Sequence, residues 1–380
     1  EETYSWVLRR MRHDAGGYYS ALSAESDGVE GGYYMWTRQE VDEVLDDEMG
    51  ALFCRAYNVK EDGNVRDEAS GETTGRNVLY LEKPMNELAE SVGVTPDELR
   101  TRLADARSKL LEVRRKRDRP DLDDKVLADW NGLMIAALAH GGNHLQDERL
   151  TRAASEAADF VLSEMRRDDR LFHVWRGGEP YVGGYLEDYA FMAHGLLELH
   201  RATGEDAWLQ EAQSLVEVLL RDFRDEKGGG FFRTSADADS LLPRLKDPTD
   251  NTVPSGNAMA ARVLLRLAEV TGTQRYRDVA RETMTTFAKS MKTSPRAAAN
   301  MILAASMYFE TAQGVSAADE EKPKPSDAEA EVTASTRKDR VTVRVTLPRD
   351  ELRRGGRVSV PIRLDIADGW AWEQEVKRIS

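Results

Sequence analysis

Cysteine is almost absent from this sequence. Its 380 residues include a single cysteine, Cys54, which excludes an internal disulfide and a cysteine-rich metal site. Cys54 lies in the apolar helical stretch ALFCRAYNV. This setting favours a buried structural thiol over a nucleophile.

Long hydrophobic runs are absent as well. No stretch approaches the roughly 18 apolar residues that a membrane-spanning helix requires. The chain opens at EETYSW, and no signal peptide is recognisable there. We therefore expect a cytoplasmic protein that has no membrane partner.

The sequence has fewer positive than negative charges, with 53 Lys and Arg against 68 Asp and Glu. The formal net charge is −15 and the sequence pI is about 5.1, so the basic footprint that nucleic-acid binding needs is missing. A surface rich in Asp and Glu and poor in Lys is typical of salt-adapted proteins. A GC-rich genome that favours arginine codons is the alternative explanation.

Several sequence motifs that are typical of particular catalytic or binding sites are missing too. The sequence has no Gly-x-Ser-x-Gly, no phosphate-binding loop and no zinc motif. We therefore expect no cofactor and no metal. A calcium loop at Asp237 and Asp239 is a weak alternative, because the glycine and glutamate of an EF-hand are not there.

What the sequence does contain is a threefold repeat. Each copy reads as a helix, a short glycine-containing turn and a second helix, and the copies begin at WNGLMIAALAHGG, EDYAFMAHGLLELHRATG and GNAMAARVLLRLAEVTG. The first helix of each copy has few charges and apolar residues at three- and four-residue spacing, whereas the second carries many more charges. The first helices are therefore expected to be inner and the second outer.

The connections between the copies are long and individual, which favours a closed toroid over a regular solenoid. TYSWVLRRMRHDAGGYYS near the start lines up with an outer helix and its following loop, so the inner partner of that helix is expected to be missing. The predicted fold is mainly α, an incomplete (α/α)6 toroid of helical hairpins with a small C-terminal β domain. The expected boundaries are 1–312 for an N-terminally truncated barrel, 313–330 for a disordered, acidic, proline-rich linker and 331–380 for a partial β-sandwich-like domain.

Polar residues recur at matched offsets near the starts of the inner helices. Asn131, Asp188 and Asn257 occupy these positions, and matched positions in a toroid converge on one end of its axis. Helix capping explains any one of them equally well. As a group, together with the neighbouring Trp130 and Tyr189, they predict the rim of a pocket.

The loops that follow the outer helices add aromatic, acidic and basic residues to this end. The stretch GGYYSALSAESDGVEGGYYMW, with two Gly-Gly-Tyr-Tyr cassettes, is expected to lie over the pocket mouth. The substrate-binding residues that we predict in the loops are Glu25, Asp27, Glu30, Trp175, Arg176, Arg244 and Lys246. Rings that stack on sugar faces and charged groups that bind hydroxyls suit a sugar or glycan. For proton transfer we predict His173 together with Glu187 or Asp188; the histidines within helical segments favour structural roles.

Four stretches carry a family resemblance: GGYYSALSAESDGVEGGYYMWT, DDKVLADWNGLMIAALA, GGYLEDYAFMAHGLLELHRATG and PRLKDPTDNTVPSGNAMAARVLLRLAEVTG. They resemble the thioredoxin-domain proteins related to spermatogenesis-associated protein 20. The resemblance covers about residues 1–312 and implies a barrel similar to N-acylglucosamine 2-epimerases and six-hairpin glycosidases. The thioredoxin-like domain is absent from this chain, and Ser23 replaces the first acidic residue of the opening loop.

Two functions follow as hypotheses. The first is a sugar-binding barrel with epimerase, isomerase or glycosidase-like activity. The second is a non-catalytic barrel scaffold that works with a thioredoxin-like partner or a second subunit.

Overall fold

The computed structural model describes residues 1–67, 70–238 and 243–314, and four strands in the remainder of the chain. The chain divides into two compact units, Glu1–Gln313 and Gly314–Ser380. Most of the linker expected at 313–330 lies outside the described residues, and so does Asp239. No helix among the described residues is long and apolar enough to cross a membrane.

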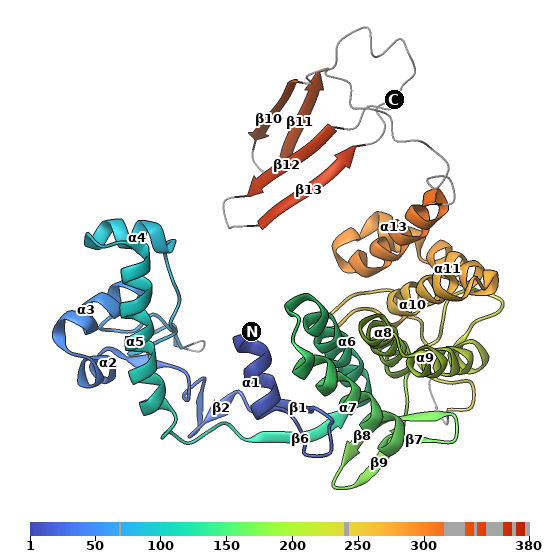
Figure 1. Ribbon diagram of the computed structural model, residues 1–380, viewed down its shortest axis with the longest axis horizontal. Coiled ribbons are helices and arrows are strands. Elements are labelled where there is room, and N and C mark those ends of the chain that lie inside the picture. Colours follow the sequence, from blue (N-terminus) through green and yellow to red (C-terminus); the bar gives the residue numbers. More distant parts are fainter. Residues whose placement is uncertain are drawn as a thin grey trace. The chain divides into compact units, whose positions relative to one another are not determined.

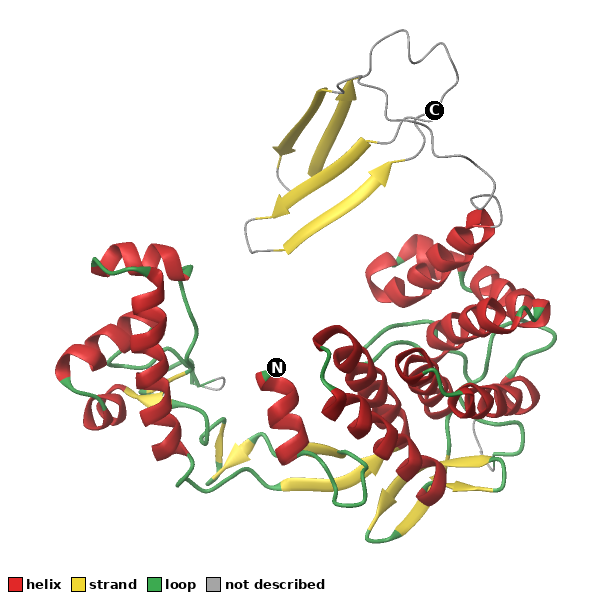
Figure 2. Ribbon diagram, in the orientation of Figure 1, coloured by secondary structure: helices red, strands yellow, loops and turns green. Residues whose placement is uncertain are grey.

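The first unit is built from helical hairpins, which Figures 1 and 2 show as successive pairs. Three complete hairpins follow one another: α6 (Ala128–Leu145) with α7 (Glu148–Glu164), α8 (Leu186–Thr203) with α9 (Asp206–Val218), and α10 (Gly256–Thr271) with α11 (Gln274–Thr286). The first helices pack on one another, α6 on α8 and α8 on α10. They bury residues around most of their circumference, whereas α7 buries one apolar stripe. The inner and outer rows predicted from the repeat, and with them the toroid of α-hairpins, are confirmed.

Two further helices extend the rows. α1 (Glu2–Arg10) lies against α6, where the hydroxyl of Tyr4 donates to the carbonyl oxygen of Ala137 at 3.1 Å. At the other end, π-helix η1 (Leu219–Phe223) continues α9, and α12 (Ala288–Thr293) and the 3-10 turn η2 (Pro295–Ala298) lead into α13 (Ala299–Gly314). α13 buries Met301 and Ala304 in the core. Its opposite side leaves Ile302, Leu303 and Phe309 exposed.

A twisted sheet crosses the end of the barrel where the inner helices begin. It consists of β1 (Tyr19–Leu22), β6 (Leu122–Leu127), β8 (Arg170–Arg176), β7 (Arg166–Arg167) and β9 (Glu179–Gly183), all paired antiparallel. Ala21 pairs with Asp123, and the N–H of Ser23 donates to the carbonyl oxygen of Asp121 at 2.7 Å. The first Gly-Gly pair brings the chain close to α7, because a Cβ on Gly16, whose φ is +119°, would lie 2.5 Å from the carbonyl oxygen of Glu156.

Residues between β1 and β6 form a smaller group of elements. These are β2 (Glu25–Ser26), β3 (Val29–Glu30), β4 (Trp36–Thr37), α2 (Arg38–Val44), α3 (Asp47–Ala56), β5 (Arg76–Asn77), α4 (Met85–Val92) and α5 (Pro96–Arg114). The group has a hydrophobic core of its own, which includes Trp36, Phe53 and Cys54. The side chain of Thr95 caps the start of α5 and accepts from the N–H of Glu98.

The second unit contains two antiparallel strand pairs. β10 (Glu331–Arg337) pairs with β11 (Arg340–Thr346), and β12 (Val360–Ile366) pairs with β13 (Trp370–Val376). The alternating pattern after residue 331 predicts strands of this kind.

Candidate functional site

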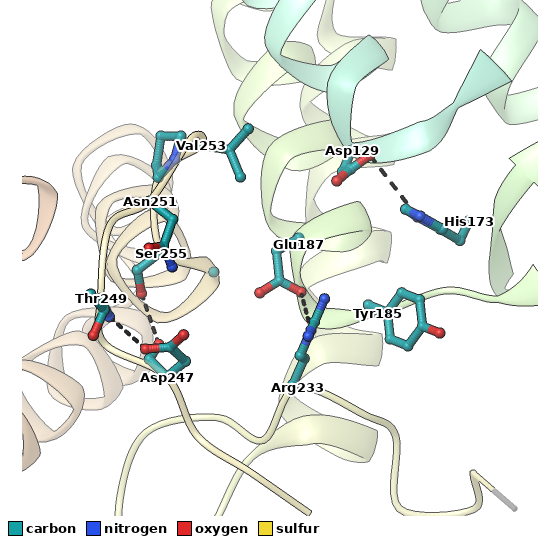
Figure 3. Close-up of a pocket in the computed structure, with 12 residues that line it drawn as sticks. Asp129, His173, Tyr185, Glu187, Arg233, Asp247, Thr249, Asn251, Val253 and Ser255 are labelled. Atoms are coloured by element: carbon teal, nitrogen blue, oxygen red, sulfur yellow. Dashed lines mark hydrogen bonds and ion pairs between the residues drawn. The ribbon is translucent and has the colours of Figure 1, made fainter. Parts of the chain in front are cut away.

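A cavity of about 240 Å³ opens where the inner helices α6, α8 and α10 begin. Figure 3 shows its side chains converging from the starts of these helices, from β8 and from the loop before α10. The lining residues are Asp129, His173, Tyr185, Glu187, Arg233, Asp247, Thr249, Asn251, Val253, Pro254, Ser255 and Gly256. The cavity thus lies at the end of the barrel where the repeat places the starts of the inner helices.

The matched asparagines of the first and third hairpins do not face this cavity. Asn131 accepts from the N–H of Tyr18 at 2.7 Å and donates to its carbonyl oxygen at 3.0 Å. Asn257 does the same for Phe231, at 2.8 and 2.9 Å. Both amides are buried, and each one clamps the backbone of a loop that follows an outer helix, the loop after α1 for Asn131 and the loop after η1 for Asn257. Our prediction that these two residues bind substrate is wrong, because all of their polar atoms already serve the fold.

The middle hairpin departs from this pattern. Here the clamp position, 19 residues before Trp208 as Asn131 is before Leu150 and Asn257 before Tyr276, is Tyr189. Its phenol accepts the loop N–H of Leu171 at 2.9 Å. The match predicted for Asp188 is therefore off by one residue, and Asp188 is not needed to hold that backbone. The carboxylate of Asp188 instead accepts from His173 Nδ1 at 2.9 Å. It also accepts the N–H groups of Tyr185 and Asp129, at 2.7 and 3.0 Å. In this hairpin Tyr189 keeps the bond to the loop, and its neighbour Asp188 holds an imidazole.

The bond to Asp188 fixes the ring of His173. A carboxylate that accepts here requires a proton on Nδ1, which leaves Nε2 as the nitrogen free for other chemistry. Burial lowers the pKa of His173, but the hydrogen bond and charge of Asp188, aided by Asp129, outweigh it and raise the pKa above its usual value. Asp188 is fully buried and does not line the cavity. Its carboxylate therefore reaches the cavity only through His173, and the catalytic role predicted for Asp188 stays a prediction.

Two carboxylates in the cavity wall have shifted acidity. Burial, followed by the charge of Asp188, raises the pKa of Asp129 to about 7. Burial also raises the pKa of Glu187, against the opposing charge of Arg233. Glu187 Oε2 is buried and has no hydrogen-bond partner among the described residues; the closest cation is Arg233, with its Nε 3.8 Å away. The site thus offers a free acceptor.

A metal ion is an alternative occupant for part of this site. Donor atoms of Asp129, His173 and Asp188 lie within 4.8 Å of one another, and no other such group occurs in the described part of the chain. The hydrogen bond from His173 Nδ1 to Asp188 explains their closeness without an ion. The absence of a metal stays a prediction.

The sequence gives no sign of several residues of the cavity, and three of them make contacts that shape it. Tyr185 precedes α8 and makes an edge contact with the ring of His173, at 5.2 Å between centroids. The guanidinium of Arg233 lies over the ring of Tyr185, 5.4 Å from its centroid. The carbonyl oxygen of Arg233 accepts from the N–H of Leu186, which binds this loop to the start of α8. Asp247 is held through its carbonyl oxygen by Ser255, the N-cap of α10. None of the three stands at a repeated position, so the repeat gives no signal for them.

Several other predicted residues lie away from the cavity because the fold uses them. Trp175 is buried in the core against Phe160, and the ring of Tyr189 is buried next to Phe223. Arg244 and Lys246 brace their own loop. The guanidinium of Arg244 donates to the carbonyl oxygens of Thr234 and Asp222. The ammonium of Lys246 donates to the carboxylate of Asp225 and the carbonyl oxygen of Gly229.

The remaining predicted residues are on the surface. Arg176 pairs with Asp124 at 2.6 Å, and Trp130 is exposed on the first turn of α6 but does not line the cavity. The strands β2 and β3 place Glu25 opposite Glu30, with Asp27 in the turn between them. The prediction that this acidic loop lies over the pocket mouth is wrong: Tyr19–Leu22 pairs with β6 and leads the chain into the segment around α2–α5.

No family model matches the chain. Comparison with known proteins does identify relatives. Human spermatogenesis-associated protein 20 is 35% identical over 334 residues, which is 80% of this chain and 42% of the relative. The rat protein of that name is 34% identical over the same shares. The chain thus spans about two fifths of the length of these relatives.

Similar solved structures include three carbohydrate enzymes. They are the cellobiose 2-epimerase from Spirochaeta thermophila (18% identity, TM-score 0.37, 43% of each chain), a GH76 alpha-mannanase from Bacteroides thetaiotaomicron (16%, 0.42, 50% of this chain and 53% of that one) and the unsaturated glucuronyl hydrolase from Bacillus sp. GL1 (20%, 0.35, 43% and 46%). Likenesses this distant do not identify a substrate. The sequence identity to the human and rat proteins shows that 80% of this chain is related to part of spermatogenesis-associated protein 20.

Proposed function

We propose that the cavity binds a small sugar and that His173 transfers a proton on it, as in an epimerase or isomerase. The observation that carries this proposal is the hydrogen bond between His173 Nδ1 and the fully buried carboxylate of Asp188, at 2.9 Å. A buried carboxylate that orients an imidazole at the wall of a cavity is the arrangement of a general acid–base pair.

The lining suits a polyhydroxylated ligand. Carboxylates of Asp129, Glu187 and Asp247 accept from hydroxyl groups, and the amide of Asn251 can both donate and accept. The ring of Tyr185 supplies a flat apolar surface of the kind on which sugars stack. With about 240 Å³ the cavity is smaller than the roughly 300–1,000 Å³ of sites for drug-sized ligands. This size favours a single sugar unit.

Proton transfer next to a carbonyl requires a base that takes the proton and an acid that returns it. His173, through Nε2, supplies one of these groups. Asp129, with a pKa of about 7, supplies a carboxyl group that carries a proton part of the time near neutral pH. Glycoside cleavage generally employs two carboxyl groups, so a histidine held by Asp188 favours epimerisation or isomerisation. A glycosidase-like activity of Asp129 and Glu187 is the alternative within the same site.

An NMR experiment in D2O distinguishes these reactions. The chain is incubated with a panel of hexoses and disaccharides, and proton spectra are recorded over time. Epimerisation or isomerisation produces a second sugar and replaces a carbon-bound hydrogen by deuterium. Hydrolysis produces new reducing ends without that exchange. We expect the exchange, and we expect His173→Asn to abolish it. If no sugar turns over and none shifts the thermal melt, the proposal is refuted.

The second candidate, a non-catalytic scaffold, is favoured by a different observation. Ile302, Leu303 and Phe309 on α13 are exposed in the described part of the first unit, and exposed apolar groups of this kind often mark a protein contact. Concentration-dependent sedimentation, together with no sugar effect on the melt, would support this candidate over the first.

A further inference from the structure

The cavity carries more negative than positive charge, and this balance bears on the class of sugar. Three carboxylates line it, those of Asp129, Glu187 and Asp247. Arg233 is the one arginine or lysine in the lining, and the charge of a protonated His173 is balanced by its partner Asp188. We propose that the ligand is an uncharged sugar and that the site rejects uronic acids and sugar phosphates. This inference rests on the proposed function.

Arg233 does not reverse this balance. Its Nε lies 3.8 Å from Glu187 Oε2, and its guanidinium stacks over Tyr185. The side chain is 63% exposed, so solvent screens its charge on the outer side. An acidic sugar that used Arg233 as its anchor would bring its carboxylate next to Glu187. Two like charges in a partly buried site repel each other.

Glu187 gives the site a positive reason to select a hydroxyl group. Its Oε2 is buried and lacks a hydrogen bond among the described residues, and an unsatisfied buried acceptor gains when a ligand donates to it. A sugar hydroxyl donates without adding charge. An ammonium group also donates, but it would compete with Arg233, which already lies beside this oxygen. The geometry therefore favours a neutral donor.

Calorimetric titration with matched sugars tests the proposal. Glucose, mannose and galactose are each compared with the corresponding uronic acid, the 6-phosphate and the 2-amino sugar, at low and at high KCl. We expect one neutral hexose to bind at least about tenfold more tightly than its uronic acid, and we expect KCl to narrow this gap because it screens the repulsion. A uronic acid, phosphate or amino sugar that binds more tightly than its neutral parent overturns the charge assignment alone. If no sugar of any charge binds, the proposed function itself fails.

Three variants separate the roles of the charges. Glu187→Gln should weaken the neutral hexose about tenfold and strengthen the uronic acid relative to it, because it replaces one of the two acceptor oxygens by an NH2 donor and removes the negative charge. Arg233→Gln should leave the preference for the neutral sugar in place; loss of binding to every sugar in this variant would make Arg233 the anchor and overturn the proposal. Glu90→Gln removes one carboxylate from exposed α4, outside the cavity lining, and serves as the charge-matched control that should change neither affinity.

Discussion

Gly256 and Glu187 touch across the boundary between α8 and α10. A Cβ built on Gly256 would lie 2.8 Å from Glu187 Oε1 and 2.9 Å from Leu186 Cγ. The absence of a side chain at the first residue of α10 thus makes room for the carboxylate in the cavity wall.

Gly256→Ala is expected to displace Glu187 and to weaken sugar binding. Overpacking of this kind typically costs about 1–3 kcal/mol, so the protein should remain folded with a lower melting temperature. Titration with the sugar that the wild type binds is the measurement. Gly183→Ala, where a Cβ would meet nothing within 4 Å, is the matched control. Equal affinities in the two variants would contradict the role given to Gly256.

Asn131→Ala is expected to destabilise the protein without a direct effect on the ligand. It leaves the buried N–H and C=O of Tyr18 without their partner, at about 1–3 kcal/mol for each unsatisfied group. Thermal melts with and without sugar measure both effects. A variant that keeps its stability but loses the sugar shift would return Asn131 to the binding site.

Stability should depend on pH through Asp129. Its pKa in the folded protein is raised from 3.8 to about 7, so the folded state binds the proton more tightly than the unfolded state does. Stability from this group is therefore greatest below about pH 4 and falls as the pH rises toward 7. The raised pKa of His173 acts in the same direction: its contribution is complete below the unfolded value of about 6.5 and disappears as the pH rises through the folded value.

Melting temperatures of the wild type and of Asp129→Asn, recorded between pH 4 and 8, test this. The melting temperature of the variant should increase relative to that of the wild type as the pH rises. Most of this relative increase should occur below pH 7. A difference that does not depend on pH would show that Asp129 titrates like an ordinary exposed carboxylate. Glu90→Gln again provides the control.

The charge of −15 predicts a strong response to salt. Repulsion between carboxylates opposes the compact state, and the screening length falls from about 10 Å at 0.1 M salt to about 3 Å at 1 M. The melting temperature should therefore rise between 0.1 and 2 M KCl. A melt that is unchanged over this range would favour codon usage over salt adaptation as the source of the composition.

The sequence predicts the helices better than it predicts the site, and the reason is physical. The repeat is a pattern of burial, so it locates the inner helices. It does not say which polar atoms the fold will use, and the match predicted for Asp188 is off by one residue. Asn131, Tyr189 and Asn257 each hold the backbone of a loop, whereas Asp188, next to Tyr189, holds His173.

Loop residues are harder still. Trp175 and Tyr185 are both aromatic residues near β8 and the start of α8, yet one is buried in the core and the other lines the cavity. Arg233 reaches Glu187 because its loop is bound to the start of α8, and that contact joins residues far apart in the sequence. Periodicity carries no information about such long-range contacts.

The hydrogen bond between Ser23 and Asp121 also has a consequence for protein engineering. The chain leaves the barrel and returns to it at adjacent points of one antiparallel ladder, and the core between these points is formed by residues of α2–α5 and their strands. Residues 24–120 are therefore connected like the tip of a long hairpin. Replacing them with a two-residue turn such as Asn-Gly would keep the β1–β6 register, and the excised piece could be produced and studied separately.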